Sequence, residues 1–175
     1  TSFVRRQGMP LLTIRGISML KQLFPQRVDN SYRGYKLALW LFALVVLIKV
    51  AMSLNSIFNG YFVARSADRI PIDTFTAAGA QTVVSLFAMW GLGHLVICLL
   101  CILVVFRYRS MIPFMFALLV LESLSRKLIL HFLPIAQTGS PPSFSVNLVL
   151  LALMIVGLAL SLRGQDNLQA QERWT

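Results

Sequence analysis

Five ionisable side chains lie within stretches of sequence that are otherwise apolar: Lys49, His94, Glu122, Arg126 and Lys127. Charged groups are costly in hydrocarbon, so each such residue is a hypothesis for a functional site. At about 1.5 Å per helical residue, all five are expected in the outer half of the membrane or near its midplane. The chemistry open to such a set is the binding of an anionic lipid, a ligand or a protein partner, or the transfer of protons.

Glu122 and Arg126 are four residues apart, which places them on one helix face at a spacing that permits an ion pair. We therefore expect a structural pair that faces the protein interior. Lys49 and Lys127 are expected to extend their ammonium groups to the headgroup layer. Two alternatives stay open: a cluster that binds an anionic ligand, a lipid headgroup or an acidic neighbouring subunit, and a proton path through Glu122 and His94.

His94, Cys98 and Cys101 occupy helix positions i, i+4 and i+7 and so share one face. The CxxC spacing also occurs in redox and metal sites. A redox pair needs an accessible thiolate of low pKa, however, and a zinc site needs a fourth ligand. The other histidine, His131, belongs to a different stretch. We interpret the cysteines as small apolar residues in a helix contact, and we expect no metal, haem or other cofactor.

Four apolar stretches must position these residues: 37–57, 82–105, 111–133 and 144–163. Each has about the 20 residues that cross a hydrocarbon core. Of the 175 residues, 57% are hydrophobic and only 13% are charged, whereas soluble domains are about 25% charged. The predicted fold class is an all-α membrane protein, with four transmembrane helices in an antiparallel bundle and an N-terminal amphipathic interfacial helix.

The chain divides into a basic N-terminal arm, a transmembrane domain and a polar C-terminal tail, with the boundaries 1–36, 37–163 and 164–175. Within the arm, residues 9–24 place apolar side chains on one side and Arg15 and Lys21 on the other. This pattern is typical of a helix that lies in the membrane interface.

Local signals predict some helix ends and contacts. Asp73 is expected to cap a helix that begins at Thr74, and Pro113 to lie in the first turn of the third stretch. Gly157 and Ser161 permit the close approach of another helix. We expect this pair to serve packing inside the protein rather than dimerisation.

The net charge of +10 follows membrane topology. Residues 1–36 hold seven Lys or Arg and one acid, the turn 107–110 holds two Arg, and the linker 134–143 holds none. Because Lys and Arg concentrate in cytoplasmic loops, both termini are expected in the cytoplasm. The same distribution argues against a nucleic-acid partner.

The basic arm and the four apolar stretches resemble those of small bacterial inner-membrane proteins, which implies an inner-membrane location. The sequence contains no phosphate-binding glycine loop and no Ser/His/Asp arrangement. We therefore expect a non-enzymatic subunit that stabilises or assembles a larger respiratory, photosynthetic or transport complex, in contact with lipid and other membrane subunits. The alternative function is a small transporter or proton-coupled carrier that uses Lys49, His94, Glu122 and Arg126.

Overall fold

The computed structural model describes residue 32 and residues 34–172, with side chains as far as Gly164. This part of the chain consists of helices and turns and contains no strand. The expected interfacial helix at 9–24, with Arg15 and Lys21, lies outside the described residues.

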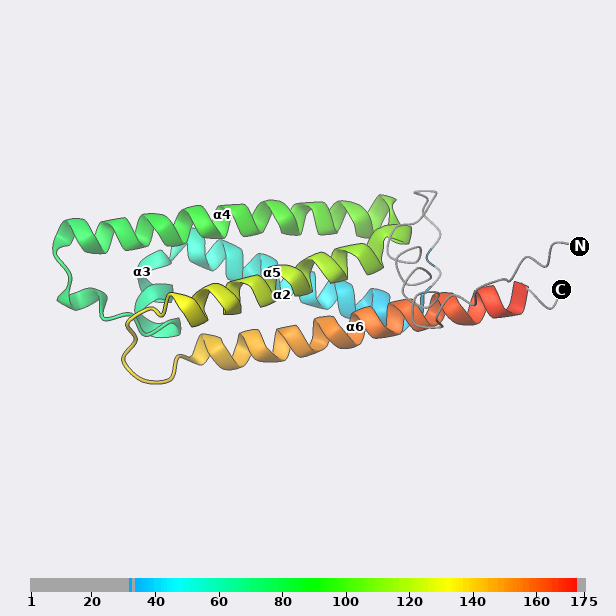
Figure 1. Cartoon of the computed structure of the whole chain (residues 1–175). Helices are drawn as coiled ribbons and strands as arrows, with labels where there is room; N and C mark the ends of the chain where they lie inside the picture. Colours follow the sequence, from blue (N-terminus) through cyan, green and yellow to red (C-terminus); the bar gives the residue numbers. More distant parts are fainter. Residues whose placement is uncertain (1–31, 33, 173–175) are drawn as a thin grey trace, which may run out of the picture.

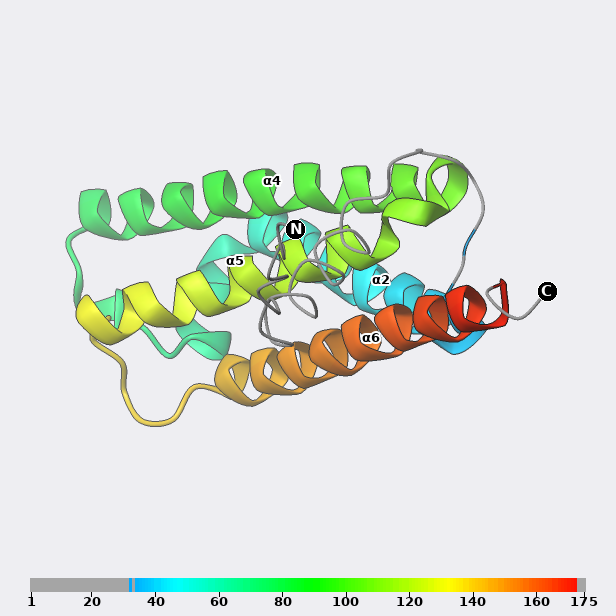
Figure 2. The same cartoon turned by 45° about the vertical axis from the view of Figure 1, so that its right-hand side comes forward.

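Four long helices lie side by side along a common direction in both views (Figures 1 and 2). They are α2 (Lys36–Phe58), α4 (Ala77–Arg107), α5 (Ile112–Phe132) and α6 (Pro142–Glu172). Helix α2 packs mainly on α4 and α6, and α5 packs mainly on α6. Short turns join them: α3 (Gly60–Phe62), the π-type turn η1 (Val63–Ala67), and the 3₁₀ turns η2 (Ile72–Thr74) and η3 (Arg109–Met111).

Three helices are long and apolar enough to cross a membrane: α2, α4 and the segment Pro142–Gly164 of α6. The chain therefore has the features of a membrane protein. Helix α5 is 21 residues long, but its acid and two cations make it less apolar, and it is not among the three. The expected crossing at 111–133 thus forms a helix, while its passage through the membrane stays a prediction.

Small residues bring α2 and α4 close together. A Cβ atom on Gly91 of α4 would lie 2.9 Å from Cβ of Ser56 and 3.0 Å from the carbonyl oxygen of Ser53. Gly60, at the end of this contact, packs against Val84 in the same way. The backbones of α2 and α4 therefore lie close together, as small residues in membrane helices allow. This close approach sets the distance between side chains that extend from one helix to the other.

Helix α6 packs through its own small residues. A Cβ atom on Gly157 would overlap the ring of Phe116 on α5, and that ring meets Phe42 of α2 edge-on at 4.8 Å. The hydroxyl of Tyr32 donates to Oγ of Ser161 over 3.3 Å. Both positions are thus occupied by contacts within this chain, as the sequence predicts for internal packing.

The apolar core lies in the half of the molecule where α2 begins and α4 ends. It includes Phe42, Val45, Cys101, Phe116 and Met154, which come from all four long helices. A smaller cluster of Ala64, Ile70 and Ile72 lies at the opposite end, against the first turns of α4. Along their helices, Lys49, His94 and Glu122 lie between these two clusters.

One predicted helix boundary is wrong, and one is confirmed. Helix α4 begins at Ala77 rather than Thr74, because the chain forms the turn η2 first. Its cap is therefore Thr76, whose hydroxyl accepts from the amide of Gly79 over 3.2 Å. Asp73 instead forms an ion pair with Arg65 in the linker before α4. Pro113 does lie in the first turn of α5. Helix α6 continues as far as Glu172, so most of the expected tail is helical.

Candidate functional site

Three helices contribute one ionisable side chain each to a cluster formed by Lys49 of α2, His94 of α4 and Glu122 of α5. Nζ of Lys49 lies 3.3 Å from Oε2 of Glu122 and 3.3 Å from Nε2 of His94. Nδ1 of His94 lies 3.7 Å from Oε1 of Glu122. The side chains are 8%, 10% and 23% exposed, respectively. We call this the Lys–His–Glu cluster.

Lys49 is the centre of this cluster, because its ammonium group bonds to both other side chains. A lysine ammonium group only donates, so it donates both to the carboxylate of Glu122 and to Nε2 of His94. Nε2 then accepts, which places the imidazole proton on Nδ1, the nitrogen that faces the other oxygen of Glu122. With Lys49 and Glu122 ionised and the imidazole neutral, the cluster carries no net charge.

Neighbouring hydroxyl groups and the close helix contact position the cluster. Oγ of Ser53 donates to the carbonyl oxygen of Lys49 over 2.8 Å, one turn further along α2. Oγ of Ser123 donates to Oε2 of Glu122 over 3.4 Å. Gly91 lies one turn before His94 and permits the approach of α2, so the lysine reaches the imidazole directly.

The predicted pair of Glu122 with Arg126 is wrong. Glu122 pairs with Lys49, while Cζ of Arg126 lies 4.2 Å from the ring centroid of Trp90 on α4. The ring centroids of Trp90 and His94 are 5.9 Å apart. Consecutive turns of α5 therefore face consecutive turns of α4, and contacts between helices replace the contact within α5.

The expectation that Lys49 extends to the headgroup layer is wrong. Its side chain is buried inside the Lys–His–Glu cluster. Nζ of Lys127 lies 5.6 Å from the ring centroid of Phe144, on the side of α5 that faces α6. The five expected site residues thus divide into a cluster of three, an adjacent Arg126, and a separate Lys127.

The two cysteines are free and buried next to the cluster on the same face of α4. Cys98 is 1% exposed and Cys101 is 0% exposed. His131 is exposed, and its ring contacts that of Phe132. In the part of the chain that the structure describes, no three His, Cys, Asp or Glu side chains gather as metal ligands would. The burial of the cysteines agrees with a packing role.

Sequence reasoning missed Trp90 and Ser53. The spacing of Trp90 and His94 on α4 matches that of Arg126 and Glu122 on α5, four residues in each case. An aromatic ring and a cation at matching positions favour a cation–π contact. This signal could have been found if the two helices had been compared position by position.

The arrangement permits two kinds of chemistry. An ammonium group bonded to an imidazole and to a carboxylate links three helices, and the same cluster provides an imidazole that could pass a proton between its neighbours. Beside it, Arg126 provides a cation that has no acid within ion-pair distance among the described residues. Comparison with protein-family models, curated proteins and solved structures finds no match to this chain.

Proposed function

We propose that this chain is a non-enzymatic integral membrane subunit that stabilises or assembles a larger complex of the bacterial inner membrane, of respiratory, photosynthetic or transport type. In this proposal all four long helices cross the membrane as an antiparallel bundle. Both termini and the 107–110 turn face the cytoplasm. No catalytic residue is assigned.

One observation carries the proposal: Lys49 binds within the chain to both His94 and Glu122, which belong to two other helices. No fully buried side-chain nitrogen or oxygen among the described residues lacks a hydrogen-bond partner. Such internal pairing supports a role in holding helices together, because a binding site for a substrate would leave polar groups free to receive it.

The remaining charge supports an acidic partner. Once Lys49 and Glu122 neutralise each other, Arg126 and Lys127 leave two positive charges on α5. Each contacts an aromatic ring, and neither has an acid within ion-pair distance among the described residues. Cations in hydrocarbon usually pair with other groups. Acidic side chains of a neighbouring subunit would supply the missing negative charges.

The proposed topology requires α5 to cross the membrane. Each charged residue at a helix centre costs roughly 2.5–3.5 kcal/mol on insertion scales, and pairing between helices offsets part of this cost. Reporter fusions test the topology: a fusion at residue 140 is expected outside the cytoplasm and a fusion at residue 175 inside. If both fusions report the same side, the topology is wrong.

The function is tested by mild-detergent purification from the native membrane at native expression. We expect stoichiometric copurification of other membrane subunits. The double variant Arg126→Gln with Lys127→Gln should weaken this association and leave the monomer folded. Arg65→Gln is the control, because Arg65 forms an exposed ion pair with Asp73 in the linker before α4, and its replacement should not change copurification. A wild-type protein that elutes alone, as a monomer or homodimer, would contradict the subunit proposal.

A second candidate, a small proton-coupled carrier, is favoured by the position of one residue. His94 lies between an ammonium and a carboxylate from two other helices, so a proton arriving at one could move to the next. The test reconstitutes the purified chain in liposomes that hold a pH-sensitive dye. Proton flux that His94→Gln abolishes would favour the carrier, whereas the subunit proposal predicts flux no different from empty liposomes.

A further inference from the structure

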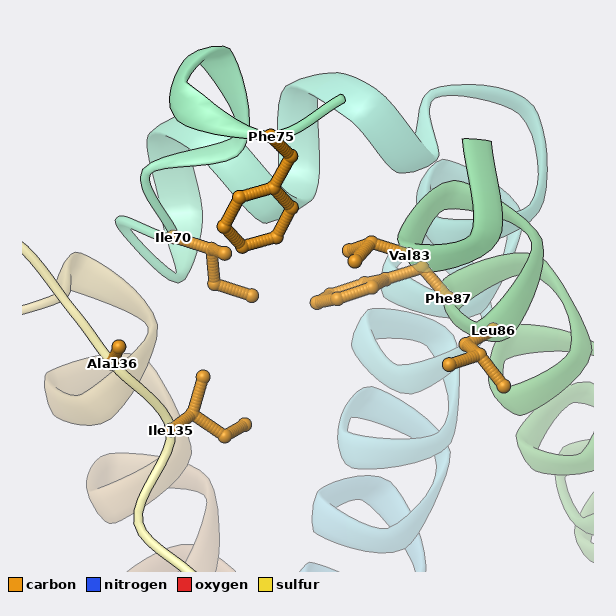
Figure 3. A pocket seen from close by; sticks show the side chains of 7 residues that line it. All are labelled: Ile70, Phe75, Val83, Leu86, Phe87, Ile135 and Ala136. Carbon is orange, nitrogen blue, oxygen red and sulfur yellow. The ribbon is translucent and has the colours of Figure 1, made fainter. Parts of the chain in front are cut away.

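An apolar pocket lies at the end of the molecule where α4 begins and α5 ends, remote from the apolar core. Its volume is about 290 Å³. Figure 3 shows side chains from three segments around it: the linker before α4, the first turns of α4, and the linker after α5. The lining side chains are all apolar and include Ile70, Phe75, Phe87, Ile135 and Ala136.

The pocket spans the expected edge of the hydrocarbon layer. Phe87 belongs to the part of α4 expected in hydrocarbon, 82–105. Ile70 and Ala136 belong to linkers expected in the headgroup region. A ligand that fits this position has an apolar chain directed into the membrane and a polar group at its surface.

Arg69 precedes Ile70 in the chain, and Ile70 lines this pocket. A Cβ atom added to Gly139 would lie 3.2 Å from Nη1 of Arg69, so the guanidinium group lies near the linker after α5, which also lines the pocket. The carbonyl oxygen of Arg69 accepts two hydrogen bonds from Thr138, from the amide over 2.9 Å and from the hydroxyl over 3.1 Å. These bonds hold the two linkers together. Arg69 has a φ of 52°, in the left-handed region that non-glycine residues seldom adopt. A held, uncommon backbone conformation of this kind is a reason to examine the residue for function.

The guanidinium group of Arg69 is available to a ligand. Its side chain is exposed, and no acid lies within ion-pair distance of it among the described residues. The neighbouring Arg65, in contrast, pairs with Asp73 over 3.0 Å. A cation without an acid next to an apolar pocket complements a molecule with an anionic head and an apolar tail.

We propose that this pocket binds one acyl chain of an anionic phospholipid, whose phosphate contacts Arg69. Arginine recognises phosphate through paired N–H donors. The apolar walls take up the chain, and the bonds from Thr138 keep the linkers that form the mouth in place. This proposal does not depend on whether the chain works as a subunit or as a carrier.

Native mass spectrometry of the purified protein tests the proposal, with equal amounts of phosphatidylglycerol and phosphatidylcholine of the same acyl chains. Wild type should retain phosphatidylglycerol in preference. Arg69→Gln should lower phosphatidylglycerol retention about fivefold, the size expected for one cation near a charged surface. Arg65→Gln is the control, because it removes the same charge, and it should retain phosphatidylglycerol as wild type does. Arg69→Lys should keep most of the preference.

Filling the pocket gives the second arm. Ala136→Phe places a ring in the pocket from an exposed linker and should lower retention of both lipids, while Gln137→Phe, the adjacent exposed residue, should not. Circular dichroism and melting without lipid confirm that each variant folds, and Ala136→Leu replaces Ala136→Phe if it does not. The proposal is overturned if Arg69→Gln matches Arg65→Gln, or if the pocket-filling variant matches Gln137→Phe.

Discussion

Among the described residues, two ion pairs, each with a third polar side chain next to it, lie in different surroundings. The buried Lys–His–Glu cluster joins three long helices, and its ion pair spans 3.3 Å between side chains that are 8% and 23% exposed. The linker cluster consists of Tyr61, Arg65 and Asp73. Its ion pair spans 3.0 Å between side chains that are 57% and 51% exposed, and Tyr61 donates to Asp73 over 2.5 Å.

The shorter ion pair, Arg65 with Asp73, is thus expected to contribute less to the free energy of unfolding than the pair of Lys49 with Glu122. At equal distance, the attraction between two charges is roughly fourfold stronger at an effective dielectric constant of about 20 than in water at about 80. Burial also makes an unpaired charge costly, whereas water solvates a charge left alone at the surface. The comparison shows that surroundings, more than distance, determine what happens when one partner is removed.

The largest effect is expected from Glu122→Gln, which leaves the Lys49 ammonium group buried without its carboxylate. Breaking a buried pair from one side typically costs about 3–5 kcal/mol, and the partial exposure of Glu122 favours the lower end. The folded yield in detergent, and the free energy of unfolding in mixed micelles, should both fall. A variant as stable as wild type would show that Glu122 is not the partner of Lys49.

A pair of double variants identifies the partner. Lys49→Met with Glu122→Gln removes both charges and leaves an amide that can still bond to His94, so much of the lost stability should return. Glu122→Gln with Arg126→Met should recover little, because Lys49 still lacks a carboxylate. A double-mutant cycle by denaturation in micelles measures both couplings. If stability recovers only in the second double variant, Glu122 pairs with Arg126 rather than with Lys49.

A smaller loss is expected from Trp90→Leu, which keeps an apolar side chain but removes the ring beneath Arg126. Cation–π contacts contribute about 0.5–1 kcal/mol at exposed sites and about 2 kcal/mol when desolvated. Because Trp90 is 39% exposed, the expected loss lies between these values. Trp90→Phe should retain part of the cation–π contribution to stability, because phenylalanine keeps an aromatic ring. Melting of the three proteins in the same detergent gives the order, and equal losses for Leu and Phe would argue against a cation–π contact.

Asp73→Asn should change stability little, because an exposed ion pair contributes about 0–1 kcal/mol. This substitution removes the same charge as Glu122→Gln, so it is the matched control for burial. The two variants should be compared by unfolding in one detergent at low and at high salt. Salt should reduce the small effect at Asp73 and leave the large effect at Glu122. Similar losses at both sites would contradict the comparison.

The smallest effect concerns the titration of Tyr61. The hydrogen bond to Asp73 raises the pKa of Tyr61 above its ordinary value of 10.0. The contribution of this bond is therefore present below pH about 10 and is lost as pH rises through the raised pKa. Ultraviolet absorbance titration, with Tyr61→Phe subtracted, should show a lower pKa for Tyr61 in Asp73→Asn. An unchanged pKa would mean that the bond does not form in solution.

The helices could be predicted from the sequence because each depends on nearby residues. The apolar stretch at 37–57 became Lys36–Phe58, and the stretch at 111–133 became Ile112–Phe132, with Pro113 in its first turn as expected. In hydrocarbon, a single apolar stretch of this length satisfies its backbone hydrogen bonds within itself by forming a helix. The start of α4 was missed because Asp73 and Thr76 are both good caps, and the choice depended on the turn between them.

The candidate residues themselves were also evident from the sequence, since Lys49, His94 and Glu122 are ionisable groups in apolar stretches. Their partners were not. Spacing along one helix favoured Glu122 with Arg126, but it contains no information about which residues of another helix lie opposite. The small residues at the contact of α2 and α4 decided that Lys49 reaches His94 and Glu122 rather than the headgroups.

The sequence by itself determined that this chain has long apolar helices, where they lie, and which few side chains carry charge within them. These properties follow from composition and from periodicity over about 20 residues. Only the tertiary structure decided which charges pair, that Arg126 lies over Trp90, and that Ile70, the residue after Arg69, lines an apolar pocket. The physical reason is that an ion pair depends on distance in space, and helix packing sets the distance between residues that are far apart in the chain.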